Sequence, residues 1–217
     1  MCGIVGFTGK REAAPVLLAG LKALEYRGYD SAGIAVMGET GLELAKTSGR
    51  IETLCELTKN GASLPGRSGI GHTRWATHGA PTDTNAHPHV SNNGKFAVVH
   101  NGIIENYMPL KQALLKKGHH FRSETDTEIV AHLMADLWDG DFESTVRKVL
   151  HTIKGSYSLV FLCAKDPSKL ICAKKNNPLV IGLGKGENYI ASDIPAIISK
   201  TRDTYILSDG EMAVVEP

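Results

Sequence analysis

The chain has 217 residues, of which 42% are hydrophobic and 22% are charged, a composition typical of an ordinary globular protein. Its 24 basic and 23 acidic side chains give a formal net charge of +1, so charge offers no reason to expect a nucleic-acid or anionic-membrane partner. No segment approaches the roughly 20 apolar residues of a membrane span, and the N-terminus lacks the basic region of a signal peptide. We therefore expect a cytoplasmic protein with no membrane or nucleic-acid partner, folded as a single domain over residues 1–217.

Four cysteines, at positions 2, 55, 163 and 172, are too few and too scattered to predict a disulfide framework. The last three lie in helix-like or strand-like runs and are interpreted as small core residues. Cys2 differs, because it precedes a short apolar run, Ile4-Val5, that reads as a buried strand and ties down the chain end. By position alone, a residue without a chemical role remains the simpler interpretation of Cys2.

Hydrophobic periodicity divides the first half of the chain into strands and helices. The expected elements are a strand at the N-terminus, helices over residues 12–25 and 51–59, hairpin strands over 34–37 and 42–45, and a strand from residue 69. Residues 77–93 show little apolar periodicity, which predicts a long irregular loop, either functional or disordered.

In the second half, a buried strand over residues 96–99 is expected to end at His100-Asn101-Gly102. Residues 123–128 contain Ser-x-x-Asp and Thr-x-x-Glu, which are typical of a helix start. The other expected elements are helices over 105–117, 129–137 and about 142–152, and strands over 157–163, 169–173, 179–183, 188–191 and 211–215. Strands at both ends with helices between them favour two sheets layered with helices.

Polar clusters interrupt these apolar runs without a packing reason, at residues 27–31, 72–79, 100–106 and 123–128. Asn101-Gly102 is the dipeptide most typical of a hairpin turn, but a helical pattern follows it instead of a second strand. Alternatively, the Asn101 amide and the Gly102 N–H converge as two donors for the oxyanion that forms when a thiol attacks a carbonyl. The residues alone leave both interpretations open.

Charged residues in two of these clusters suit the two ends of an amino acid. The fork of Arg74 can bind a carboxylate through two parallel hydrogen bonds, although a surface arginine beside a core Trp75 is the alternative. Asp126 suits a helix start through the helix dipole, and it can also bind an ammonium group. The histidines of residues 77–93 have no carboxylate or cysteine at a zinc-like spacing, so no metal and no cofactor are predicted.

Taken together, these clusters resemble the glutaminase domains of glucosamine-6-phosphate synthases, which are also called glutamine–fructose-6-phosphate aminotransferases. The matching segments, in chain order, are Met1–Gly6, Tyr26–Gly33, Gly71–Gly79, His100–Asn106, Ser123–Glu128, Pro178–Gly184 and Ile190–Asp193. The resemblance therefore covers essentially the whole chain. It implies an α+β fold, a four-layer αββα sandwich of the N-terminal nucleophile hydrolase type.

The resemblance also implies a mechanism. After Met1 is removed, the Cys2 thiol attacks the side-chain amide of L-glutamine, and the new α-amine of Cys2 serves as the base, through a water molecule. Ammonia leaves, and the γ-glutamyl thioester is hydrolysed to glutamate. Asn101 and Gly102 are implied to form the oxyanion hole.

The substrate pocket follows from the same resemblance. Arg74 is implied to bind the α-carboxylate of glutamine, and Asp126 its α-ammonium. The other implied pocket residues are Thr77 and His78, Trp75 on a loop that closes over the pocket, and Arg27, whose motif lies near the nucleophile.

In the intact enzymes of this family, a sugar isomerase domain receives the ammonia and converts fructose 6-phosphate into glucosamine 6-phosphate. We expect the full-length enzyme to be a homo-oligomer, and this chain, which lacks the isomerase domain, to release ammonia without making an amino sugar.

Three other functions compete with this one. The first is the glutaminase domain of another amidotransferase, such as the purine-pathway or asparagine-synthesising enzymes. The second is a non-catalytic glutamine-binding module, although binding alone needs no thiol. The third is a papain-like protease using Cys2 and His100, which lacks that family's cysteine signature.

Overall fold

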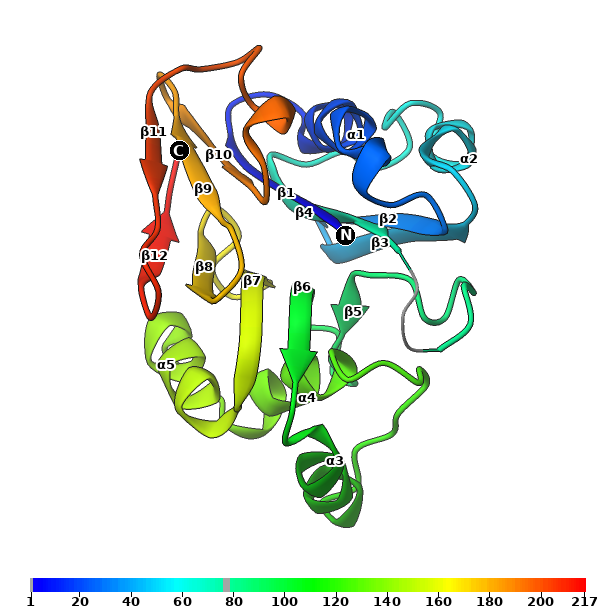
Figure 1. The fold of residues 1–217 in the computed structure, drawn as a ribbon, viewed down its shortest axis with the longest axis vertical. Coiled ribbons are helices and arrows are strands. Elements are labelled where there is room, and N and C mark those ends of the chain that lie inside the picture. The colour runs from blue at the N-terminus through cyan, green and yellow to red at the C-terminus, as the bar shows by residue number, and fades with distance from the viewer. Residues whose placement is uncertain (1, 76–78) are drawn as a thin grey trace.

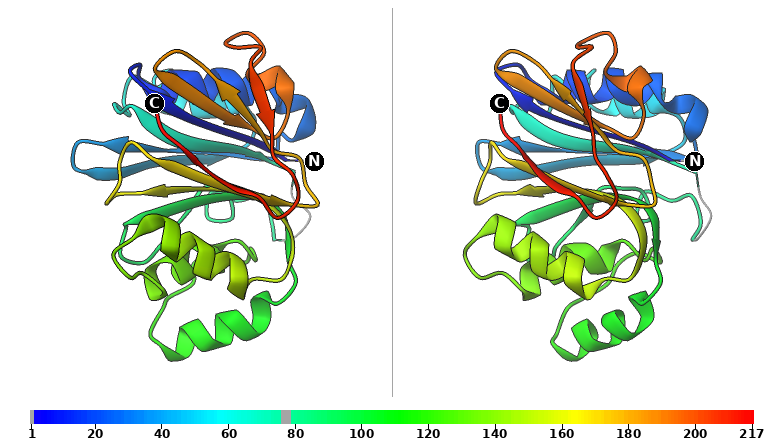
Figure 2. Two further views of the ribbon diagram at one scale, coloured as in Figure 1. Left: turned by 90° about the vertical axis from the view of Figure 1, so that its left-hand side faces the viewer. Right: turned by 60° about the vertical axis from the view of Figure 1, so that its left-hand side comes forward.

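The computed structural model describes residues 2–75 and 79–217. Two antiparallel sheets lie face to face, and helices cover the outer face of each sheet (Figure 1). Figure 2 shows these four layers edge-on, with the two sheets in the middle. The predicted four-layer αββα sandwich is therefore confirmed.

The first sheet has seven strands in the order β11-β9-β10-β1-β4-β2-β3. They are β1 (Gly3–Gly9), β2 (Ser31–Gly38), β3 (Gly41–Ser48), β4 (Ser68–Arg74), β9 (Val180–Leu183), β10 (Glu187–Ala191) and β11 (Thr204–Ile206). Strand β1 lies in the middle, and its Gly3 pairs with Thr73 of β4. Because the pairing is antiparallel, Cys2 comes to lie beside the end of β4, which ends at Arg74 and is followed by Trp75.

The second sheet has five strands in the order β12-β8-β7-β6-β5. They are β5 (His89–Val90), β6 (Phe96–Ile104), β7 (Gly155–Cys163), β8 (Leu170–Lys175) and β12 (Met212–Val215). Strand β6 extends beyond the predicted residues 96–99, because its pairing with β7 continues as far as Ile104 opposite Gly155. Asn101 and Gly102 therefore lie inside a strand, and the hairpin-turn interpretation is wrong.

The helices divide between the two outer layers. Helices α1 (Ala13–Ala23) and α2 (Ile51–Leu57) pack on the first sheet, and α3 (Tyr107–Lys116), α4 (Glu128–Asp136) and α5 (Phe142–Thr152) pack on the second. Alternation along the strands separates three apolar layers. In β1, Val5 packs toward α1, whereas Ile4 packs between the sheets with Val99 of β6. No helix of the described residues is long and apolar enough to cross a membrane.

Some local expectations differ from the structure. Strand β5 lies within the predicted loop 77–93, and β11 and the short helix η2 (Ile194–Ala196) were not predicted. The helix-start pattern at residues 123–128 forms no capping box, because Thr127 is the N-cap and makes no side-chain cap hydrogen bond. Instead, the Glu128 carboxylate accepts hydrogen bonds from the Ser123 backbone and hydroxyl, both at 2.7 Å. Asp126 consequently lies ahead of α4 and not in its first turn.

Candidate active site

The ends of β1, β4 and β6 and the segment before α4 converge on a small cavity of about 70 Å³. It is lined by Cys2, His72, Arg74, Trp75, His87, His100, Asn101, Gly102, Thr125, Asp126 and Thr127. Most of the predicted site residues thus lie together, although Thr77 and His78 fall outside the described residues. A larger cavity of about 650 Å³ lies elsewhere, and the described residues that line it include no cysteine or histidine.

The Cys2 thiol lies against the peptide that follows β4. The N–H of Trp75 donates a hydrogen bond to Cys2 Sγ at 3.2 Å. Burial raises the pKa of the thiol, and the Trp75 hydrogen bond offsets part of this rise. Because a thiol of raised pKa is protonated near neutrality, Cys2 needs a base before it can act as a nucleophile.

Gly28, in the polar cluster after α1, allows a close approach to this peptide. A Cβ at position 28 would lie 2.8 Å from the carbonyl carbon of Arg74 and 3.0 Å from Trp75 N. The N–H of Asp30 also donates to Arg74 O at 3.0 Å. The cluster therefore fixes the peptide that holds the thiol. Only the packing reveals this role of Gly28.

Asn101 connects the thiol residue to β4. Its amide Nδ2 donates to the carbonyl oxygen of Cys2 at 3.0 Å. At the other end of the amide, Oδ1 lies 3.0 Å from Nε2 of His72. Gly102 follows with a φ of +127°, and a Cβ there would lie 2.1 Å from Ser156 O on β7, so only glycine fits.

Arg74 and Asp126 both border the cavity. Arg74 is only 5% exposed, and its guanidinium donates to the carbonyls of Ala80 and Gly79, each at 3.2 Å. Burial lowers the Arg74 pKa. The Asp126 carboxylate accepts a hydrogen bond from Ile104 N at 2.7 Å. These contacts orient a cationic and an anionic group beside the same cavity.

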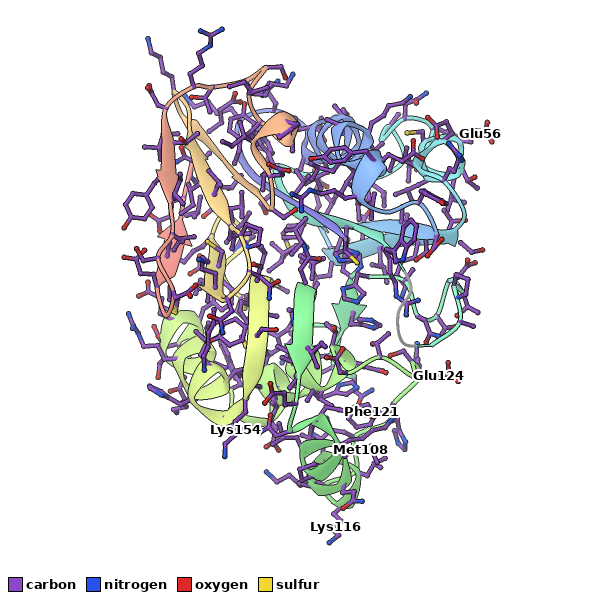
Figure 3. All side chains as sticks on the ribbon, viewed as in Figure 1. Glu56, Met108, Lys116, Phe121, Glu124 and Lys154 are labelled. Atoms are coloured by element: carbon purple, nitrogen blue, oxygen red, sulfur yellow. The ribbon has the colours of Figure 1, made fainter. Side chains whose placement is uncertain are left out.

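Trp75 also borders the cavity, and the carbonyls of Gly79 and Ala80 hold Arg74 beside it. The expected alternative of a surface arginine beside a core tryptophan is reversed, since Trp75 is 43% exposed and Arg74 is buried. The Trp75 ring packs edge-on against Tyr29, with 5.3 Å between ring centroids. Asn85 donates to Ala80 O and to Glu124, which Figure 3 shows on the segment leading to α4. The loop that orients Arg74 is thereby tied to a second element.

Arg27 is not among the residues that line the cavity. It belongs to the short helix η1 (Glu25–Arg27), and its guanidinium forms an ion pair with Asp193 at 2.5 Å. The Tyr26 hydroxyl donates to the same carboxylate at 2.6 Å. The structure thus assigns Arg27 a contact between distant segments, and its expected role near the nucleophile stays a prediction.

Buried histidines surround the site. Burial lowers the pKa of His72 and of His89 to about 3, so both rings are neutral near pH 7. His100 Nδ1 lies 2.9 Å from the Thr127 hydroxyl and Nε2 lies 3.5 Å from Ser156 O, so both ring nitrogens have partners other than the Cys2 thiol, which disfavours the protease alternative. Among the described residues, no group of three or more histidine, cysteine, aspartate or glutamate side chains is arranged to hold a metal ion.

A cysteine that precedes the central strand of an αββα sandwich is the arrangement of the N-terminal nucleophile amidotransferases. A solved structure of this class, the glutamine phosphoribosylpyrophosphate amidotransferase from B. subtilis, matches with a TM-score of 0.78 and 28% identity, over 99% of this chain and 49% of that one. The model of the glutamine amidotransferase domain family matches residues 72–199. The chain belongs to this family.

Curated relatives show which kind of amidotransferase the chain is most similar to among those compared. The chain is 54% identical, over 100% of its own length and 35% of the relative, to the glutamine–fructose-6-phosphate aminotransferase (isomerizing) of Caldanaerobacter subterraneus subsp. tengcongensis. The enzyme of the same name from Pyrococcus horikoshii is 54% identical over 99% of this chain and 36% of the relative. The chain therefore spans about a third of the length of these relatives.

Proposed function

We propose that the chain is the glutaminase part of a glutamine–fructose-6-phosphate aminotransferase and hydrolyses the side-chain amide of L-glutamine. The observation that carries this proposal is the convergence of the Cys2 thiol, the Asn101 amide and the Arg74–Asp126 pair on one cavity. Identity of 54% to an aminotransferase of this name, against 28% to the phosphoribosylpyrophosphate enzyme, favours it over another amidotransferase.

Removal of Met1 would give Cys2 a free α-amine, whose ordinary pKa of about 7.7–8.0 suits a general base near neutrality. The amine takes the thiol proton, through a water molecule, as Sγ attacks the amide carbon of glutamine. The oxyanion is held by Asn101 Nδ2 and the N–H of Gly102. Collapse of the tetrahedral intermediate passes the proton to the leaving nitrogen and releases ammonia. Water then hydrolyses the γ-glutamyl thioester to glutamate and restores the thiol.

Arg74 and Asp126 would select the zwitterionic end of glutamine, with Thr77 and His78 as further pocket residues and Trp75 as a cover. Binding the charged end at one point and the thiol at another sets the amide carbon within reach of Sγ. The role of Arg27 would be indirect, through its ion pair with Asp193.

The coverage of only 35% of a relative's length supports a partner domain in the full-length enzyme. We propose a sugar isomerase domain that binds fructose 6-phosphate and uses the ammonia, in a cytoplasmic homo-oligomer. In such an enzyme, residues 1–217 supply the ammonia from which the isomerase domain forms glucosamine 6-phosphate.

The proposal is tested by glutamate release from L-glutamine, measured with and without fructose 6-phosphate. We expect hydrolysis that the sugar phosphate does not stimulate, loss of at least 1000-fold in Cys2→Ala, and full activity in the control Cys55→Ala, which changes a partly buried cysteine of α2. Intact mass reports the removal of Met1. Full activity in Cys2→Ala would refute the mechanism, and failure of an electrophilic glutamine analogue to alkylate Cys2 would favour a binding module.

A further inference from the structure

His72 touches the proposed oxyanion donor but has no part in the mechanism above. We propose that His72 is a positioning residue, which fixes the orientation of the Asn101 amide so that Nδ2, and not Oδ1, faces the nucleophile. The inference rests on the proposed function and adds a residue to it.

The need for such a residue follows from the shape of an amide. Nitrogen and oxygen of an asparagine side chain have nearly the same size, so packing cannot distinguish the amide from its 180° flip. Chemically the two states are opposite. Nδ2 offers two N–H donors, one for the Cys2 carbonyl and one for an oxyanion, whereas Oδ1 in its place would repel the developing negative charge.

Hydrogen-bond partners at both ends resolve the choice. The Cys2 carbonyl can only accept, and it lies 3.0 Å from Nδ2. At the other end, His72 Nε2 lies 3.0 Å from Asn101 Oδ1 and 3.2 Å from His100 O. Because a backbone carbonyl can only accept, Nε2 carries the ring hydrogen. If Asn101 were flipped, its Nδ2 donor would face the Nε2 donor of His72, and its Oδ1 would face the Cys2 carbonyl oxygen. Each group left unpaired in this way would cost about 1–3 kcal/mol of stability.

His72 is itself firmly held. It lies in β4, is 1% exposed, and stacks on the His87 ring with 4.2 Å between centroids and 20° between planes. Among the described residues, its Nδ1 has no hydrogen-bond partner. That is the pattern expected of a neutral ring with its hydrogen on Nε2, because a hydrogen on Nδ1 would be a buried donor without an acceptor.

The test compares three substitutions of His72. His72→Leu removes the donor, His72→Asn keeps a polar group too short to reach Asn101, and His72→Gln places an amide N–H near the position of Nε2. We expect kcat for glutamine hydrolysis to fall about 10–100-fold in the first two and to recover largely in the third, because loss of an oxyanion donor costs about 100–1000-fold. His72→Asn decides the question if His72→Leu does not fold.

Two further readouts separate positioning from structural support. Glutamate γ-semialdehyde adds reversibly to a thiol and forms an oxyanion, whereas glutamate does not. In the His72 variants, inhibition by the aldehyde should therefore weaken in parallel with kcat. Inhibition by glutamate should stay within about threefold of the wild type. In an Asn101→Ala background, His72→Leu should lower kcat by less than about threefold further, since the two residues act as one unit.

An undiminished kcat in both His72→Leu and His72→Asn overturns the inference. So does equal weakening of both inhibitors, or the same loss with and without Asn101. These outcomes leave the wild-type glutaminase intact, whereas a wild-type chain that does not hydrolyse glutamine overturns the proposed function and this inference together.

Discussion

Replacement of Gly102 by alanine tests the oxyanion hole at the point where the backbone, and not a side chain, supplies the donor. The added Cβ would lie 2.1 Å from Ser156 O and 2.8 Å from Ser156 C, both backbone atoms of β7. Contacts of a Cβ below 3.0 Å essentially never occur, so β6 must move away from β7 by roughly 1 Å at this residue.

Two costs follow from the geometry. The φ of +127° strains an alanine by about 1–3 kcal/mol, which lowers the unfolding temperature of a chain of this size by about 2–12 °C. The displacement moves the N–H that is proposed to bind the oxyanion, and a misplacement of about 1 Å can cost about 100-fold in rate. We therefore expect kcat for glutamine hydrolysis to fall by at least about 100-fold.

Gly41 provides the matched control, since its φ is +134° and a Cβ there meets nothing within 4 Å. Gly41→Ala should carry a similar backbone strain, seen by thermal unfolding, with kcat unchanged. If Gly102→Ala and Gly41→Ala show the same kcat, the N–H of Gly102 does not stabilise the transition state.

The other predictions concern binding and acid stability. Arg74→Lys should raise KM for glutamine about 10–100-fold in steady-state assays with little change in kcat, because lysine lacks the fork that grips a carboxylate, and an unchanged KM would contradict this role. Arg11→Lys, which alters an exposed arginine paired with Glu187, is the control. Burial raises the pKa of Glu128, but the His132 ring, whose Nε2 lies 3.4 Å from Oε1, and hydrogen bonds from residues 122–123 outweigh it and hold the pKa at about 2, below the ordinary 4.5. The stability that the ionised Glu128 provides is complete above pH 4.5 and is lost as pH falls toward 2. Between these values, the free energy of unfolding in urea should fall about 1.4 kcal/mol per pH unit more steeply for the wild type than for Glu128→Gln. Parallel pH profiles of the two proteins would refute this prediction.

Alternation of apolar residues predicted the strands that bury one face or both. Strand β7 was expected over 157–163 and runs from Gly155 to Cys163. The predicted end of β6 was wrong because polar residues interrupt the apolar run, whereas the backbone pairing of β6 with β7 continues regardless of side-chain polarity. Strand β11 could not be predicted, since all three of its residues are exposed and burial leaves no pattern in them.

Some features of the candidate site could likewise be predicted from the sequence, and others could not. Arg74 and Asn101 were recognisable because each belongs to a short polar cluster beside an apolar run, whereas the role of Cys2 followed only from the resemblance of all the motifs together. The helix-start pattern before α4 misled, because Ser123 donates to Glu128 and not to Asp126, and Asp126 accepts its hydrogen bond from Ile104 of β6. Local sequence states which groups are available but not which acceptor each one finds.

His72 shows the consequence most clearly. In the sequence it is one more residue of a polar cluster, and nothing local distinguishes it from a histidine that merely packs. Its role depends on two carbonyl oxygens: that of Cys2, which accepts from the Asn101 amide, and that of His100, which lies against Nε2 of the His72 ring. Buried polar groups must pair, so a site that requires one orientation of an amide also requires a second residue with a fixed donor. In the proposed mechanism, the orientation of the Asn101 amide beside Cys2 then depends on the tautomer of the His72 ring.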